Sequence, residues 1–134
     1  MEHVGIVVDD LAAATEFFVE LGLVLQGEAP VEGRWVDRIV GLEGVRADTA
    51  MMQTPDGNGR LELVKFHSPS SQGDNRHAPA NTLGIRHLAF AVKDIDAVVA
   101  AFEPAALNSS ARWSATRTAT GSAMSAARRE SSSS

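Results

Sequence analysis

A nine-residue pattern that occurs twice constrains the fold of this chain more than any other feature. Residues 3–11 read HVGIVVDDL, and residues 87–95 read HLAFAVKDI. In each copy a histidine precedes apolar residues at alternate positions, which is the period of a half-buried β-strand. An aspartate that can cap a helix follows the strand. Two copies in 134 residues predict two similar units, each opening with a strand that leads into a helix.

The residues after the first copy predict how the first unit continues. Residues 11–22 place apolar side chains at helical spacing, and Gly22 fits the end of that helix. The segments that read as strands are 23–32, 45–54 and 60–66. The run PDGNG between the last two predicts a tight turn and an antiparallel pair. We expect residues 33–44 to form an irregular loop with at most a short helical turn, so residues 1–66 form one strand–helix–strand–strand–strand unit.

The second copy begins in the same way and then loses its pattern. Residues 67–82 are polar and contain Pro, Ser and Asn, which predicts a linker, and residues 83–104 form the start of a second unit. Residues 105–134 contain nine Ser and eight Ala, and no Val, Ile or Phe. Strand interiors favour β-branched and aromatic residues, so we predict no strand there and interpret the segment as an aberrant, disordered tail.

A single-base frameshift near residues 100–103 would explain this change of character. Read one base earlier with GC-rich codons, residues 111–134 can encode a strand–turn–strand sequence that ends in GIIVE. In that frame a glutamate stands at the position of Ser134. The alternative is a natural Ser-, Ala- and Thr-rich disordered tail.

Composition excludes several classes of function. The chain has no Cys, so disulfides and thiolate chemistry are excluded. A net charge of −5 argues against binding to nucleic acid or to anionic membranes. No apolar run reaches the roughly 18 residues of a membrane helix, and no signal peptide opens the chain. We therefore expect a cytoplasmic protein whose partner is a small molecule.

Three side chains are candidates for a metal site. His3 and His87 occupy the same position in the two copies, beside small residues that leave room on their face of the strand. Glu62 lies between Leu61 and Leu63, so its side chain points to the face opposite the leucines. Two imidazoles and a carboxylate suit Zn, Ni, Co, Mn or Fe. Taken singly, each histidine is more simply explained as a solvated or hydrogen-bonded side chain.

The tandem βαβββ pattern, with the motif H-[VL]-x-[IF]-x-V-x-D-[LI] opening each copy, resembles the vicinal oxygen chelate superfamily. That group includes glyoxalase I, methylmalonyl-CoA epimerase, extradiol dioxygenases and bleomycin-resistance proteins. The resemblance implies an α+β fold of tandem βαβββ units around a cavity, with the second unit incomplete in this chain. It also implies a divalent metal on His3, Glu62 and His87, with Glu62 as the catalytic carboxylate. The fourth ligand of the family, a carboxylate on the last strand, is missing from the sequence as written.

The function that this resemblance implies is that of a glyoxalase-like lyase or isomerase. It would act on a small substrate with vicinal oxygens through an enediolate, as a homodimer, and its activity would be impaired here by the missing ligand. Two alternatives remain, a metal-free binding protein of the bleomycin-resistance type and an Fe(II) extradiol dioxygenase. Arg34 and Arg38 are further side chains that could contact an anionic substrate, although surface salt bridges explain them better.

Overall fold

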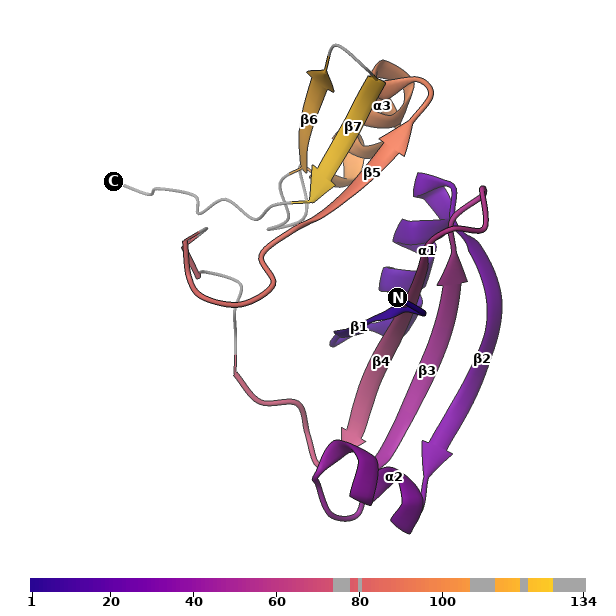
Figure 1. Ribbon diagram of the computed structural model, residues 1–134, viewed down its shortest axis with the longest axis vertical. Coiled ribbons are helices and arrows are strands. Elements are labelled where there is room, and N and C mark those ends of the chain that lie inside the picture. The colour runs from indigo at the N-terminus through magenta and orange to yellow at the C-terminus, as the bar shows by residue number, and fades with distance from the viewer. Residues whose placement is uncertain (74–77, 80, 107–112, 119–120, 127–134) are drawn as a thin grey trace. The chain divides into compact units, whose positions relative to one another are not determined.

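The computed structural model describes residues 1–73, 78–79, 81–106, 113–118 and 121–126, with side chains described as far as Phe102 (Figure 1). The chain divides into two compact units, Met1–Gly73 and Asp74–Ser134, which we call the first and second units. In the described residues, the first unit has a mixed sheet with two helices and the second has an antiparallel sheet with one helix, so the fold belongs to the α+β class that the sequence predicted.

The first unit is built on a four-stranded sheet in the order β1-β4-β3-β2 (Figure 1). Its strands are β1 (Val4–Val7), β2 (Val24–Glu32), β3 (Arg46–Gln53) and β4 (Arg60–Ser68). β1 runs parallel to β4, and the other neighbours are antiparallel. The predicted turn between β3 and β4 is present, and Asp56 organises it by accepting hydrogen bonds from Thr54 Oγ1 and the Asn58 N–H.

Helix α1 (Leu11–Leu21) forms where the sequence predicted it. Asp10 caps its first turn, with Oδ1 accepting from the Ala13 N–H at 2.9 Å. Gly22 ends it in the left-handed region, at φ 110°, a conformation that glycine adopts without strain. α1 packs against β2, β3 and β4.

The face of the sheet that α1 covers is the apolar core of the first unit. On β4, Leu61 is 6% exposed and Leu63 is fully buried, and on β3 Ala50 and Met52 are fully buried. These four residues pair with one another across the two strands, so they lie on a single face. Each buried aliphatic side chain of this size contributes about 1.5–3 kcal/mol to folding.

Helix α2 (Arg34–Val40) occupies the segment for which an irregular loop was expected. It covers one end of the other face of the sheet, where Val36 packs on Val45 and Ala47. Asp37 fixes the turn after α2, because its carboxylate accepts the backbone N–H groups of Gly44 and Val45. The loop prediction missed this helix because its stability comes from one buried valine and a local carboxylate, which leave no periodic apolar stripe.

The described residues of the second unit form a three-stranded antiparallel sheet in the order β5-β7-β6 and one helix. Its elements are β5 (Leu88–Val92), α3 (Ile95–Ala106), β6 (Trp113–Thr118) and β7 (Gly121–Ala126). α3 is capped as α1 is, with Asp94 Oδ1 accepting from the Ala97 N–H at 3.0 Å. Ile95 and Phe102 are each 6% exposed, and the helix packs against β6 and β7.

The prediction that residues 105–134 contribute no strand is wrong at β6 and β7. The ladder between β5 and β7 pairs Leu88 with Ala126 and Val92 with Ser122. Ladder hydrogen bonds join main-chain groups, so a strand can form from small residues when a neighbour offers an unpaired edge. The rest of the expected disordered tail, residues 107–112, 119–120 and 127–134, lies outside the described residues.

Candidate functional site

The face of the first sheet that α1 leaves uncovered carries the candidate site. Glu62 on β4 pairs with Gly5 of β1 on one side and with Met51 of β3 on the other. Because paired residues share a face, Glu62 lies opposite the buried Leu61 and Leu63. The predicted placement of Glu62 away from the leucines is therefore confirmed.

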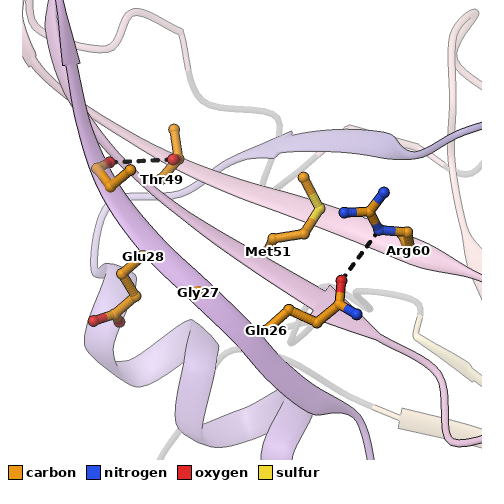
Figure 2. A pocket seen from close by; sticks show the side chains of 7 residues that line it. Gln26, Gly27, Glu28, Thr49, Met51 and Arg60 are labelled. Carbon is orange, nitrogen blue, oxygen red and sulfur yellow. Dashed lines mark hydrogen bonds between the residues drawn. The ribbon is translucent and has the colours of Figure 1, made fainter.

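A groove of about 310 Å³ runs along the same face near β2 (Figure 2). The residues that line it are Gln26, Gly27, Glu28, Ala29, Thr49, Met51 and Arg60. Its floor is part of the sheet, where Thr49 Oγ1 donates to the Ala29 carbonyl at 3.1 Å. The guanidinium of Arg60 lies over it, on the side of Met51.

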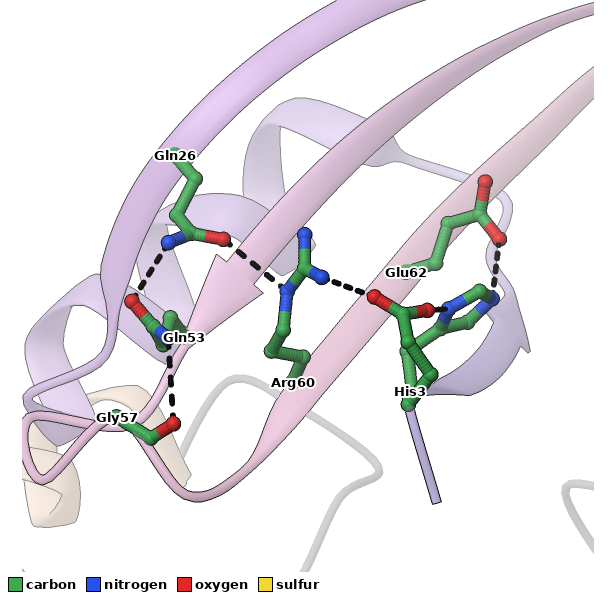
Figure 3. A network of polar contacts seen from close by, with 7 residues as sticks. His3, Gln26, Gln53, Gly57, Arg60 and Glu62 are labelled. Carbon is green, nitrogen blue, oxygen red and sulfur yellow. Dashed lines mark hydrogen bonds and ion pairs between the residues drawn. The ribbon is translucent and has the colours of Figure 1, made fainter.

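His3 meets Glu62 on this face (Figure 3). His3 Nε2 lies 3.1 Å from Glu62 Oε2, and the two side chains are 35% and 30% exposed. Gly5 lies on β1 two residues after His3, and a Cβ built on it would meet nothing within 4 Å. The structure thus brings together two of the three predicted site residues in a partly open position that a small molecule can reach.

Glu2 holds the other side of the His3 ring. Its Oε2 bonds to His3 Nδ1, and its Oε1 bonds to Arg60 Nη1. This hydrogen bond, which Glu2 accepts from the His3 ring, raises the pKa of His3 and lowers the pKa of Glu2 itself. With a carboxylate at each ring nitrogen, the protonated imidazolium satisfies both, since it has two N–H donors.

The polar contacts continue from Arg60 across the sheet to the β3–β4 turn (Figure 3). Arg60 Nε donates to Gln26 Oε1 at 3.2 Å, and Gln26 Nε2 donates to Gln53 Oε1 at 2.6 Å. Gln53 Nε2 donates in turn to the Gly57 carbonyl at 3.3 Å. Sequence reasoning missed Arg60, although one signal was available, since a residue two positions from Glu62 in a strand lies on the same face.

His87 belongs to the second unit, where it immediately precedes β5 and is exposed. Its position before β5 is equivalent to the position of His3 before β1 in the first unit. Among the described residues of either unit, no three His, Asp or Glu side chains form a group that could hold a metal ion. A complete site would therefore need donors beyond the His3–Glu62 pair.

The spacing of that pair fits two ligands of one ion. Metal bonds to imidazole nitrogen and carboxylate oxygen are about 2.0–2.2 Å long, which places neighbouring ligand atoms about 3.0–3.5 Å apart. His3 Nε2 and Glu62 Oε2 are 3.1 Å apart. A metal at Nε2 requires that nitrogen to lose its proton, and Glu2 at Nδ1 is the type of outer partner that orients a ligating histidine.

No helix in the described part of the chain is long and apolar enough to cross a bilayer.

Comparison with known proteins gives consistent matches. Residues 2–121 match the family model described as the Glyoxalase/Bleomycin resistance protein/Dioxygenase superfamily. A crystal structure of a glyoxalase family protein from Bacillus cereus is 37% identical, covers 96% of this chain and 93% of its own, and has a TM-score of 0.75. The uncharacterized protein YaeR of Escherichia coli strain K12 is 33% identical over 104 residues, 77% of this chain and 68% of YaeR. The crystal structure of SMU.1112c, 23% identical, with coverage of 93% and 86% and a TM-score of 0.57, supports the fold alone.

Proposed function

Because the chain belongs to the glyoxalase/bleomycin resistance protein/dioxygenase superfamily, we propose that it is a metal-dependent lyase or isomerase of the glyoxalase type. Its substrate is a small molecule with two oxygens on neighbouring carbons. The observation that carries the proposal is the His3–Glu62 pair, which presents a nitrogen and an oxygen donor 3.1 Å apart on the open face.

His3, Glu62 and His87 would hold the ion, which the donor types suit to Zn, Ni, Co, Mn or Fe. When bound, such an ion supplies Lewis-acid stabilisation of negative charge that develops on the two substrate oxygens. The contacts of the first unit support this assignment, since Glu2 orients His3 from behind. The assignment of His87 is supported by the repeat, in which His87 and His3 occupy the same position.

Glu62 is the residue that we assign to proton transfer. Its carboxylate is partly exposed on the open face, and its Oε2 lies 3.1 Å from His3 Nε2. It takes the proton from the carbon that bears the hydroxyl and returns it to the neighbouring carbonyl carbon, while the hydroxyl proton passes to the neighbouring oxygen, so the reaction is an isomerisation with no net change in protons or electrons. Gly5, which pairs with Glu62 on β1, leaves space on one side of it for a substrate.

We also propose that the protein works in the cytoplasm as a homodimer. The first unit alone provides two donors, and superfamily members commonly complete the site with a second unit, often across a dimer. Light scattering of the purified chain tests this, and a monomer with full activity would contradict it.

Metal analysis tests the central assignment. We expect the purified protein to bind a divalent ion, and His3→Ala, Glu62→Gln and His87→Ala each to weaken its affinity by more than about tenfold, the loss typical of an outer partner. His67→Ala is the matched control, because His67 pairs with Asp48 at 2.7 Å on the α1 side of the sheet. Metal content that is unaffected by any of the three variants would reject the proposal.

The metal-free binding protein of the bleomycin-resistance type is the second candidate. It is favoured by the way His3 is satisfied, as an imidazolium between Glu2 and Glu62, without any metal. Ligand binding by protein that contains no metal would establish it. The Fe(II) extradiol dioxygenase would use the same donors, and oxygen consumption with catechol as the probe would distinguish it from an isomerase.

A further inference from the structure

We propose that Arg60 anchors a carboxylate of the substrate in the groove beside His3 and Glu62. The inference rests on the proposed function, because it takes the His3–Glu62 pair as the place where the substrate's two oxygens bind. It adds the substrate class, a small organic acid whose carboxylate lies at the end remote from those oxygens.

The position of Arg60 is the first support. Arg60 is the one cationic side chain among the described residues that line the groove of about 310 Å³. Its guanidinium lies over the groove and toward Met51 (Figure 2). The planar fork of a guanidinium matches the two oxygens of a carboxylate.

The guanidinium is also held in place before any ligand binds. Gln26 accepts from Nε at 3.2 Å, and Gln53 in turn fixes the Gln26 amide. Among the described residues no partner contacts Nη2, and the Arg60 side chain is 35% exposed. A held donor with an open nitrogen loses little conformational entropy when an anion arrives.

Glu2 shows how a carboxylate binds here. Its carboxylate spans Arg60 and His3, and its side chain is 62% exposed near the start of the chain. An exposed ion pair of this kind contributes little to stability, so a ligand can replace it at small cost. We infer that Glu2 occupies the anion position in the free protein and competes with the substrate for Arg60.

The strand geometry sets the length of the substrate. Arg60 and Glu62 are two residues apart on one face of β4, which separates their Cα atoms by about 6.6 Å. A chain of four or five carbons, with a vicinal oxygen pair at one end and a carboxylate at the other, spans that distance. The groove admits such a molecule and favours a negative charge at its far end.

A pair of probes tests the inference on the full chain. 2-Oxoglutarate and 2-oxopentanoate share the 2-oxo acid group, and only the first has a remote carboxylate. Titration calorimetry measures both dissociation constants, with the metal-loaded and the metal-free protein. We expect 2-oxoglutarate to bind at least about tenfold more tightly, the effect of one charge-assisted hydrogen bond.

Substitutions then assign that preference to Arg60. Arg60→Gln should weaken 2-oxoglutarate by about tenfold or more and leave 2-oxopentanoate within about twofold. Glu2→Gln should tighten 2-oxoglutarate, because it removes the competing carboxylate. Arg46→Gln is the charge-matched control. Arg46 is exposed at the first position of β3, whereas Arg60 pairs with the last, Gln53, so this substitution should change neither dissociation constant.

Equal affinities of wild type for the two probes, or no binding of either at millimolar concentration, would overturn the inference. Equal weakening of both probes by Arg60→Gln would also overturn it, because it would show a structural role. The metal content of the purified protein tests the proposed function separately from this inference. If the protein binds no metal but still prefers 2-oxoglutarate, the carboxylate site at Arg60 stands and the proposed metal-dependent activity fails.

Discussion

The two units begin alike and differ in which strand lies beside the first. In the first unit β1 pairs in parallel with β4, whereas in the second unit β5 pairs antiparallel with β7. In chain order β5, α3, β6 and β7 correspond to β1, α1, β2 and β3. Since β3 runs opposite to β1, removing the fourth strand from the first arrangement brings the third strand against the first in an antiparallel pair, as the second unit shows.

This difference concerns the strand that carries most of the candidate site residues. The opening strand of each unit is preceded by a histidine, but Glu62 and Arg60 both lie on the fourth strand, β4. Among the described residues of the second unit, no strand corresponds to β4. The second unit therefore offers a histidine without the carboxylate that faces it in the first unit.

Replacing the tail by its shifted-frame sequence should have the largest effect. We replace residues 111–134 by the strand–turn–strand sequence of the shifted reading frame, which ends in GIIVE. Its β-branched residues should cover α3 better than those of β6 and β7, and its final glutamate supplies a carboxylate, so metal affinity should rise by more than about tenfold and the melting temperature should increase. Equal melting temperature and equal metal content in the two chains would show that the second unit gains nothing from the shifted-frame sequence.

Core substitutions should distinguish the two sheets next. Leu63→Ala empties a fully buried position on β4 and should cost about 2–5 kcal/mol of unfolding free energy. Leu88→Ala on β5 removes the same atoms from a half-buried position and should cost less. Urea denaturation followed by circular dichroism measures both, and equal losses would contradict the view that the first unit has the better core.

The helix caps should show what the units share. Asp10 and Asp94 accept the same type of backbone hydrogen bond, at 2.9 and 3.0 Å. Asp10→Ala and Asp94→Ala should each cost about 1 kcal/mol of local stability. Amide hydrogen exchange in α1 and α3 measures the loss helix by helix. Effects that differ severalfold would show that the units already diverge at their first turn.

The smallest effect concerns the turn that leads into β4. Hydrogen bonds from Thr54 and the Asn58 N–H lower the pKa of Asp56. Because the folded pKa lies below the unfolded one, this stabilisation is present above the unfolded pKa and is lost as pH falls through the folded pKa. Asp56→Asn should therefore lower the urea midpoint slightly at neutral pH, with the gap from wild type closing in acid. A gap that widens in acid would contradict this sign.

Much of the first unit could be predicted from the sequence because its signals are local. Alternation along strands placed Glu62 opposite the leucines, and Gly22 together with one of the two aspartates before Leu11, which the structure shows to be Asp10, bounded α1. The contact of Gln26 with Arg60 could not be predicted, because Gln26 lies at a register shift in β2 between Leu25 and Gly27. Such a bulge changes the side of the sheet that a side chain reaches, and alternation alone does not reveal it.

The strands β6 and β7 show a second limit of sequence reasoning. Outside Trp113 and the threonines of β6 they consist mainly of Ala, Ser, Gly, Met and Arg, which give little side-chain preference for a sheet, and β7 pairs through main-chain groups with the edge of β5. The joint placement of His3 and Glu62 followed from alternation and the repeat. The Glu2 carboxylate behind His3 did not, because residues 1–3 precede the periodic part of β1.

X-ray absorption of the cobalt- or zinc-loaded protein tests the central claim most directly, because imidazole ligands give characteristic outer-shell scattering. The account predicts nitrogen and oxygen ligands at about 2.0–2.2 Å with two imidazoles in the wild type, from His3 and His87. His3→Ala should reduce the count to one imidazole, and His67→Ala should leave it at two. A spectrum without imidazole scattering, or one that His3→Ala leaves unchanged, would contradict the assignment of His3 and Glu62 as a metal site.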